Sequence, residues 1–291
     1  MSEPSLTAET FAAAVDRLTA HCERPVVVKL GGSAMEDPAA TDACLRCVAT
    51  LHHLRVPVVL VHGGGKPIDR AMAEAGLTPK KVAGRRYTDD ATLSIVVRVL
   101  HELNRDLAHR LNALGVPAVP TTEADDFPLM GERLLLPSLD LQPVDLGRVG
   151  KVTGVRTERF GQAVADGGLL AVIPSLAIDT DGGWLNVNAD TAASAVAGTL
   201  KADKAVFLTD TPGVLRDRAN PRSLISQLTE SECRALIASG VIDGGMVPKV
   251  EACFEALEAG AKSALILDGR VPYSLLNVFL HDTFTGTVIT R

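Results

Sequence analysis

Two glycine clusters, each beside a basic residue, are the first part of the chain that could do chemistry. "KLGGS" carries Lys29 at the end of an apolar run, and "VHGGGK" follows a second apolar run at residues 61–66. One Gly-Gly pair is usually only a turn, but glycines at strand ends let backbone N–H groups approach an anion, and a following helix N-terminus adds positive potential. A buried ammonium group also needs a charge partner. The two clusters therefore predict an anion site in which a phosphoryl group neutralises Lys29.

The familiar phosphate-binding and catalytic motifs do not match these clusters. "VHGGGKPID" lacks the spacing of a Walker loop, and Ile68 occupies the last glycine position of a GxGxxG pattern. "GGSAM" has no final glycine, so Ser33 is not on a nucleophile elbow. Cys44 and Cys47 form a CxxC, but no second pair completes a zinc site, and their apolar neighbours at helical spacing favour simple helix packing. These exclusions leave a phosphate site of another design.

Three polar segments farther along the chain could complete such a site. "LNVNADTAA" supplies Asn186, Asn188 and Asp190 ahead of a small-residue helix, although Asp190 could simply cap that helix. "FLTDTPGVL" follows an apolar run with a Pro-Gly turn. "DGGMVPK" opens a helix and places Lys249 in its first turns, where a lone cation is unfavourable unless an anion lies nearby.

Apolar β-branched runs alternate with helical patterns along most of the chain. This alternation is typical of βαβ units and a mainly parallel sheet, so the predicted fold class is α/β. In such sheets ligands bind beyond the carboxyl ends of the strands, which is where the glycine clusters fall. The predicted strands lie at residues 25–30, 56–65, 168–176, 204–210 and 263–269.

Three segments depart from the alternation. Residues 89–115 carry a long apolar stripe, which predicts either a core helix or a subunit interface. A shorter stripe from Phe11 to Leu18 predicts a helix that packs on its own domain or on a neighbouring subunit. Residues 120–160 are rich in proline and turn residues, and they predict hairpins or a lid in place of another βαβ unit.

The composition argues against several classes of partner. The 291 residues carry a net charge of −6 and only 3% aromatic residues, whereas a nucleic-acid-binding protein needs a basic face or stacking platforms. No apolar stretch approaches the length of a membrane helix, and the N-terminal residues lack the basic head and apolar core of a signal peptide. Five cysteines, an odd number, fit reduced thiols, so a cytoplasmic location is expected.

Six motifs, taken in order, resemble those of the amino acid kinase family. They span roughly residues 25–290 and read "VVVKLGGSAM", "VVLVHGGGKPID", "GRRYTD", "LNVNADTAA", "VFLTDTPGVL" and "DGGMVPKV". The resemblance implies a three-layer αβα sandwich with a mainly parallel central sheet at residues 25–291, after an N-terminal helical extension at residues 1–24. It also implies an acyl-substrate lobe at about 25–178 and an ATP lobe at about 179–291.

The same resemblance implies a role for each motif. Lys29 and Lys249 would stabilise the transferring phosphoryl group, and Asp190 would hold both lysines in place. Backbone donors and substrate-gripping side chains would come from Gly31, Gly32, Gly64, Gly65, Arg86 and Asn186. The nucleotide-binding loops would contain Asp210, Gly213, Val214, Leu215, Gly244, Gly245 and Met246.

The activity implied by the resemblance is ATP-dependent phosphorylation of the side-chain carboxylate of N-acetyl-L-glutamate, in arginine biosynthesis. ATP would be the co-substrate, with Mg²⁺ held mainly by its phosphate oxygens and without a metal site on the protein. A carboxylate with a pKa of about 4.3 is already ionised at pH 7, so no general base is needed. Repulsion between two anions is the obstacle, and ammonium groups, glycine N–H donors and Mg²⁺ would counter it. A homodimer is expected, or a hexamer through the N-terminal helix.

Alternatives remain open at this point. The acidic segment "TTEADDFPLMGERL" replaces a Ser/Gly-rich turn, and "RRYTD" also resembles kinases of carrier-linked or acetylated aminoadipate in lysine biosynthesis. Outside the enzyme class, the same acidic segment supports a non-catalytic regulatory homologue. Asp282 and Thr283 stand where arginine-inhibited members carry a Glu-Gly element, which weakens the expectation of an arginine site.

Overall fold

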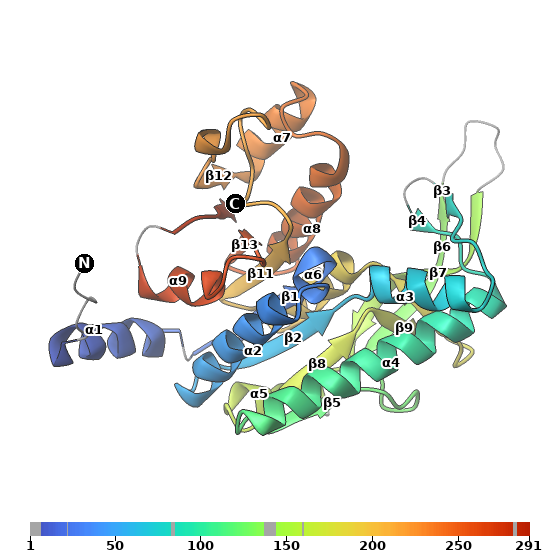
Figure 1. Cartoon of the computed structure of the whole chain (residues 1–291), viewed down its shortest axis with the longest axis horizontal. Coiled ribbons are helices and arrows are strands. Elements are labelled where there is room, and N and C mark those ends of the chain that lie inside the picture. Colours follow the sequence, from blue (N-terminus) through green and yellow to red (C-terminus); the bar gives the residue numbers. More distant parts are fainter. Residues whose placement is uncertain (1–6, 22, 83–84, 137–143, 159, 282–283) are drawn as a thin grey trace.

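β1 (Val26–Leu30) lies inside an eight-stranded sheet in the computed structural model, which describes residues 7–21, 23–82, 85–136, 144–158, 160–281 and 284–291. The strand order is β12-β14-β13-β11-β1-β2-β8-β5, and all neighbours are parallel except β13 and β14. The other strands are β2 (Val58–His62), β5 (Ala118–Pro120), β8 (Leu170–Pro174), β11 (Lys204–Thr209), β12 (Gln227–Thr229), β13 (Ser263–Asp268) and β14 (Thr287–Thr290). The predicted mainly parallel sheet and its five predicted strands are confirmed (Figure 1).

The side chains of β1 alternate between two helical layers, because successive residues of a strand point to opposite faces. Val26, Val28 and Leu30 pack in one buried cluster, with α2 (Pro38–His53), α9 (Ser274–Leu280) and the end of α4 (Asp90–Ala113). Val27 packs in the other, with α3 (Gly65–Glu74), α6 (Ala189–Thr199) and α8 (Val247–Glu258). The three-layer αβα sandwich is thereby confirmed. Because Lys29 lies two residues after Val27, it points to the layer that contains α6.

A smaller closed sheet of four strands adjoins the main one. It is built from β6 (Leu129–Leu136), β7 (Val144–Val155), β9 (Leu176–Ile178) and β10 (Trp184–Val187). The antiparallel β6–β7 pair confirms the predicted hairpin at residues 120–160, whereas a lid function stays a prediction. The predicted lobe boundary near residue 178 also stays a prediction, and it would separate β9 from β10, which pair with each other.

Short elements connect these layers. Three of them belong to the sequence motifs, namely the hairpin of β3 (Lys81–Val82) with β4 (Arg85–Arg86) and the 3₁₀ helices η1 (Gly32–Met35) and η3 (Gly244–Met246). The others are α5 (Gly161–Ala165), η2 (Pro221–Ser223) and α7 (Glu230–Ala238).

α4 is the long helix predicted at residues 89–115. Asp89 caps it by accepting a hydrogen bond from the Thr92 backbone N–H at 2.8 Å. Its apolar stripe is buried in the two core clusters, which confirms the core interpretation of the stripe. Neither α4 nor any other helix of the described residues is long and apolar enough to cross a membrane.

α1 (Ala8–Thr19) is the predicted N-terminal helix, and it contacts α9. Leu18 is buried against the main body, whereas Phe11 is 56% exposed. The helix therefore packs on its own chain by one end and leaves the other apolar end uncovered (Figure 1). The expectation about an arginine site rests on Asp282 and Thr283, which lie outside the described residues.

The CxxC of Cys44 and Cys47 lies on α2. Both thiols are buried and free of disulfide bonds, which confirms the interpretation as helix packing. Burial raises the pKa of both, that of Cys47 to about 11, so neither thiol is a reactive thiolate near neutral pH.

Asp203 joins the segment after α1 to the start of two central strands. Its Oδ2 atom lies 2.8 Å from Nδ1 of His21 and 3.1 Å from Nζ of Lys204, and its Oδ1 atom lies 3.3 Å from Nζ of Lys262. The hydrogen bond from His21 is the main reason why the pKa of Asp203 is held below its usual value. One carboxylate therefore holds three cationic or potentially cationic groups together.

We expect Asp203→Asn to lower the free energy of unfolding by about 2 kcal/mol at pH 7, because a largely buried partner of several charged groups is removed. The loss should shrink as pH falls below about 3.9, because the unfolded carboxylate then binds a proton that the folded one, with its lowered pKa, binds only at lower pH. Urea unfolding at several pH values measures this, with the exposed Asp181→Asn as the control. Equal midpoints for the two variants at pH 7 would contradict the prediction.

Candidate functional site

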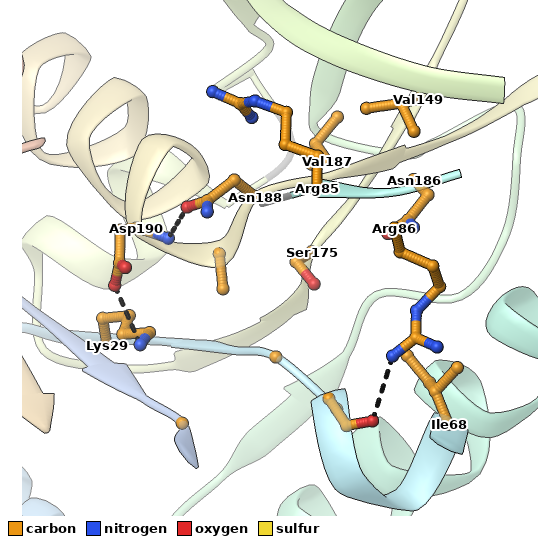
Figure 2. A pocket seen from close by; sticks show the side chains of 15 residues that line it. Lys29, Ile68, Arg85, Arg86, Val149, Ser175, Asn186, Val187, Asn188 and Asp190 are labelled. Carbon is orange, nitrogen blue, oxygen red and sulfur yellow. Dashed lines mark hydrogen bonds and ion pairs between the residues drawn. The ribbon is translucent and has the colours of Figure 1, made fainter. Parts of the chain in front are cut away.

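Lys29 and Asp190 form an ion pair at the centre of the molecule. Nζ of Lys29 lies 2.8 Å from Oδ1 of Asp190, and Lys29 is only 8% exposed (Figure 2). Gly31 makes room for this ammonium group, because a Cβ atom at that position would lie 2.8 Å from Nζ. Sequence reasoning from the strand alone assigns a phosphoryl group as the charge partner of Lys29. In the structure Asp190 is the partner of Lys29, as the family resemblance implies, and a phosphoryl group beside Lys29 stays a prediction.

α6 presents Asp190 because another residue caps the helix. Oδ1 of Asn188 accepts hydrogen bonds from the backbone N–H groups of Asp190 at 2.7 Å and Thr191 at 3.2 Å. The alternative that Asp190 itself caps the helix is therefore wrong, and its carboxylate is left to face Lys29. Farther along α6, Ser194 donates to the carbonyl oxygen of Ala252 at 2.7 Å, which fastens α6 to α8.

A first cavity, of about 280 Å³, opens beside the ion pair. Figure 2 shows Lys29 and Asp190 on one side of it and Arg86 on the other. Seven of the predicted site residues line it, namely Lys29, Gly31, Gly64, Gly65, Arg86, Asn186 and Asp190. Gly32 begins η1, and its part in the site stays a prediction.

Arg86 and Asn186 are both held in place by neighbours. Nη1 of Arg86 lies 2.6 Å from Oδ1 of Asp69, and its Nη2 donates to the carbonyl oxygen of Gly65 at 3.2 Å. Nδ2 of Asn186 donates to Oγ1 of Thr88 at 3.1 Å. A guanidinium group and an amide are thus fixed on the wall of the first cavity, where they can bind a carboxylate.

His62 fixes the glycine loop before α3 through a hydrogen bond to its backbone. This residue is fully buried, and its Nε2 accepts a hydrogen bond from Nδ2 of Asn104 at 3.0 Å, since an amide nitrogen can only donate. The ring proton is therefore on Nδ1, which donates to the carbonyl oxygen of Gly63 at 3.0 Å. α3 begins at Gly65 without a side-chain cap, so its first N–H groups remain available to an anion.

A second cavity, of about 410 Å³, lies beyond β11 and has largely apolar walls. It is lined by Asp210, Thr211, Gly213, Val214, Leu215, Arg218, Val241, Ile242, Gly245, Met246 and Lys249. All the predicted loop residues except Gly244 are in this set, and Gly244 lies next to it at the start of η3. A cavity with apolar side chains and a few polar groups is suited to a flat ligand with a charged end.

Gly213 allows the turn that forms part of this second cavity. Its φ angle is +142°, and a Cβ atom there would lie 2.5 Å from Oγ1 of Thr287. That hydroxyl oxygen also accepts from the Val214 backbone N–H at 2.8 Å and donates to the carbonyl oxygen of Ile225. A residue with a side chain at position 213 would therefore displace the turn.

Lys249 lies on the wall of the second cavity and not of the first. Its Nζ atom is 3.4 Å from the carbonyl oxygen of Gly245. Among the described residues, Asp190 forms its ion pair with Lys29, and the holding of both lysines by Asp190 stays a prediction. The two lysines thus belong to different cavities, as they would if they approached one transferred group from opposite sides.

Several lining residues were not predicted as site residues. Ser175 directly follows β8, and its place at the carboxyl end of a predicted strand was the available signal. Arg85 also lines the first cavity, and its position beside Arg86 in "GRRYTD" was the only hint. Ile68, within "VHGGGKPID", and Val149, outside the six motifs, line the same cavity with apolar side chains.

The comparison with family models adds the decisive observation, because the model of the amino acid kinase family matches residues 24–268. The chain belongs to this family. An acetylglutamate kinase of Pelotomaculum thermopropionicum is 36% identical, with 100% of both chains covered. One of Clostridioides difficile (strain 630) is 35% identical over 98% of this chain and 97% of the relative.

A solved structure supports the family fold. N-acetylglutamate synthase from Neisseria gonorrhoeae, complexed with coenzyme A and N-acetyl-glutamate, superposes with a TM-score of 0.80 at 22% identity. The match covers 99% of this chain and 64% of that one. The amino acid kinase fold therefore extends over almost the entire sequence.

We expect the stability of the protein to fall as pH drops from about 6.5 to about 4, in part through His62. Burial lowers the pKa of His62 to about 4, with a smaller effect from His101, so the unfolded chain binds a proton in this range that the folded chain does not. His62→Gln should flatten the profile by up to about 3 kcal/mol. Chemical unfolding across this pH range measures it, and the exposed His53→Gln is the control. A wild-type slope in His62→Gln would refute this origin.

Proposed function

We propose that this member of the amino acid kinase family transfers the terminal phosphoryl group of ATP to the side-chain carboxylate of N-acetyl-L-glutamate, in arginine biosynthesis. One observation supports the proposal most directly. The Lys29–Asp190 pair lines a cavity that is also lined by Arg86 and Asn186, and a second cavity is lined by the loops predicted to bind the nucleotide and by Lys249. The names of the relatives, acetylglutamate kinases over the full length, support the choice of acyl substrate.

The first cavity is the proposed site of the acylated amino acid. Arg86 offers a planar fork that can bind both oxygens of the substrate's α-carboxylate, and Asn186 can contact the same end of the molecule. With that end held, the side-chain carboxylate reaches toward Gly31 and Lys29. The uncapped N-terminus of α3 attracts the negative charge that accumulates between the α-carboxylate and the side-chain carboxylate of the substrate.

Phosphoryl transfer then needs positioning and charge neutralisation, and little proton chemistry. A substrate carboxylate oxygen forms the new bond to the terminal phosphorus. The bond from that phosphorus to the bridging oxygen breaks, and its electron pair leaves with ADP. Lys29 lies on the acyl side of the transferred group and Lys249 on the nucleotide side. Asp190 holds the buried Lys29 in position, and it takes no proton from the substrate.

The second cavity is the proposed nucleotide site. Its apolar wall of Val214, Leu215, Ile242 and Met246 suits a purine base, and Lys249 suits the phosphate end. Mg²⁺ enters with ATP, held mainly by phosphate oxygens, as is common for this ion. Asp210 is the one carboxylate among the described lining residues and fits a single additional contact to it.

We expect the wild-type protein to form an acyl phosphate from N-acetyl-L-glutamate and MgATP, trapped with hydroxylamine as the hydroxamate. A panel with glutamate, N-acetylaspartate, N-acetylaminoadipate and a carrier-linked aminoadipate identifies the acyl acceptor. Activity on an aminoadipate substrate alone would reassign the protein to lysine biosynthesis. ATP binding without transfer to any acceptor would identify a regulatory homologue.

In the same assay, Lys29→Ala and Lys249→Ala should each lower kcat by a factor on the order of 100 or more, because each removes a fixed charge at the transferred group. Lys151→Ala is the matched control, since Lys151 pairs with Glu132 on the exposed β6–β7 hairpin. Circular dichroism verifies that each variant is folded. Turnover within a factor of three of the control would remove either lysine from the mechanism.

The protein is further proposed to work in a reducing cytoplasm as a homo-oligomer, a dimer or a hexamer. Four free buried cysteines, Cys44, Cys47, Cys233 and Cys253, support the first statement. The exposed Phe11 on α1 supports a contact with another subunit. Phe11→Asp should lower the molar mass measured by light scattering if α1 joins subunits, and an unchanged mass would leave α1 outside the interface.

A further inference from the structure

Ser175 is a buried residue whose hydroxyl group has no partner among the described residues. It is 5% exposed and lines the first cavity. Its backbone N–H donates to the carbonyl oxygen of His62 at 2.9 Å, and its carbonyl oxygen accepts from the Val187 backbone N–H at 3.2 Å. Its hydroxyl group forms no hydrogen bond with any residue that the structure describes. Because buried hydroxyl groups are nearly always paired in folded proteins, this one indicates a polar partner that enters the cavity.

The backbone of Ser175 is fixed at the junction of the two sheets. The residue follows β8 of the eight-stranded sheet and precedes β9 of the closed sheet, and its two backbone hydrogen bonds join it to β2 and β10. Figure 2 shows its side chain between the Lys29–Asp190 pair and Arg86, with the hydroxyl oxygen directed into the cavity. The hydroxyl group therefore faces the middle of the first cavity and neither of its ends.

Asn186 lines the same cavity and has a free acceptor atom. Oγ1 of Thr88 donates its single proton to the carbonyl oxygen of Arg86 at 3.0 Å, so it can only accept the hydrogen bond that joins it to Asn186 at 3.1 Å. The Nδ2 side of the Asn186 amide is thereby fixed against Thr88. The Oδ1 atom lies on the other side of the amide and forms no hydrogen bond within the described part of the chain. The walls of the cavity thus include an unused acceptor on Asn186 and an unused hydroxyl group on Ser175.

We propose that Ser175 is a specificity-determining residue, which donates a hydrogen bond from its hydroxyl group to the acyl carbonyl oxygen of the substrate. The proposal rests on the phosphotransfer function given above. With the α-carboxylate at Arg86 and the side-chain carboxylate at Lys29, the amide of an acylated amino acid lies between them, where Ser175 faces it. The amide N–H is then the donor for Oδ1 of Asn186.

This pairing distinguishes an acylated amino acid from one with a free amino group. An ammonium group has only donors, so it leaves the hydroxyl proton of Ser175 without an acceptor in a buried site. A site that hydrogen-bonds one group of its substrate rejects an analogue that lacks this group, because the buried polar atom then stays unpaired. Ser175 contacts none of the reacting atoms, so it contributes to the selection of the substrate and not to the transfer step.

The test compares Ser175→Ala with Ser94→Ala on two substrates. Ser94 is exposed on α4, where its hydroxyl group bonds only to the carbonyl oxygen of Asp90, so Ser94→Ala removes one hydroxyl group outside the cavity. The second substrate, 2-propylglutarate of the matching configuration, replaces the acetamido group of N-acetyl-L-glutamate by a propyl group of equal length and lacks both polar groups of the amide. We expect Ser175→Ala to raise KM for N-acetyl-L-glutamate about tenfold, with kcat within threefold of wild type. Its KM for 2-propylglutarate, and both KM values of Ser94→Ala, should stay within twofold of wild type.

Calorimetric titration makes the same comparison without catalysis. Ser175→Ala should bind N-acetyl-L-glutamate about tenfold more weakly than wild type and should bind 2-propylglutarate equally well. Ser175→Thr keeps a hydroxyl group and should recover part of the loss. If the wild type forms no hydroxamate with any acceptor, the proposed function fails, and this titration still decides whether Ser175 binds the acyl carbonyl group.

Four results would overturn the proposal. The first is equal weakening of both compounds in Ser175→Ala, which would place the hydroxyl group at a carboxylate. The second is a lowered kcat with an unchanged KM, which would place it at the reacting atoms. The third is behaviour of Ser175→Ala like that of Ser94→Ala, and the fourth is a wild type that binds neither compound. Thermal unfolding distinguishes these from misfolding, and Ser175→Ala should unfold within about 2 °C of wild type because its hydroxyl group makes no bond that would be lost.

Discussion

The buried ammonium group of Lys29 is the constraint on which the rest of the site depends. A charge that is only 8% exposed must have a partner, and Asp190 provides it at 2.8 Å. To bring that carboxylate to β1, α6 has to begin directly over the strand, with Asn188 as its cap. Gly31 must lack a side chain for the same reason. One ion pair thus determines three local features that the sequence distributes over 160 residues of the chain.

The two cavities differ in the chemistry of their walls. The first has fixed polar groups and almost balanced charges, and the second has apolar walls with a lysine at its edge. α6 and α8 each carry a residue of the proposed mechanism, and the hydrogen bond from Ser194 to Ala252 ties these helices together. Small residues at this contact, such as Gly198 beside Ala259, allow the helices to approach closely. The spacing of Asp190 and Lys249 therefore follows from helix packing, not from loops.

Much of the fold could be predicted, because β-branched runs and helical stripes reflect burial directly. Strands buried on both faces, such as β1 and β2, and the long stripe of α4 fall where the sequence indicates. The glycine clusters could also be assigned to strand ends. The partner of Lys29 could not be found from periodicity, because Asp190 is remote in sequence and its local context equally suits a cap. Arg85 was missed because the sequence gives no sign that two adjacent residues of a short strand both line the first cavity.

The place of β1 in the sheet has a mechanical consequence. Lys29 lies opposite Phe207 in register, so the proposed reacting centre lies beside the boundary between β1 and β11, the strand that leads to the second cavity. If one half of the sheet rotates against the other about that boundary, atoms near it move least and atoms at the outer loops move most. The hairpin that bears Arg85 and the turn at Gly213 would then undergo the largest displacements. Reactants could enter and leave at the rim while the Lys29–Asp190 distance at the pivot stayed nearly constant.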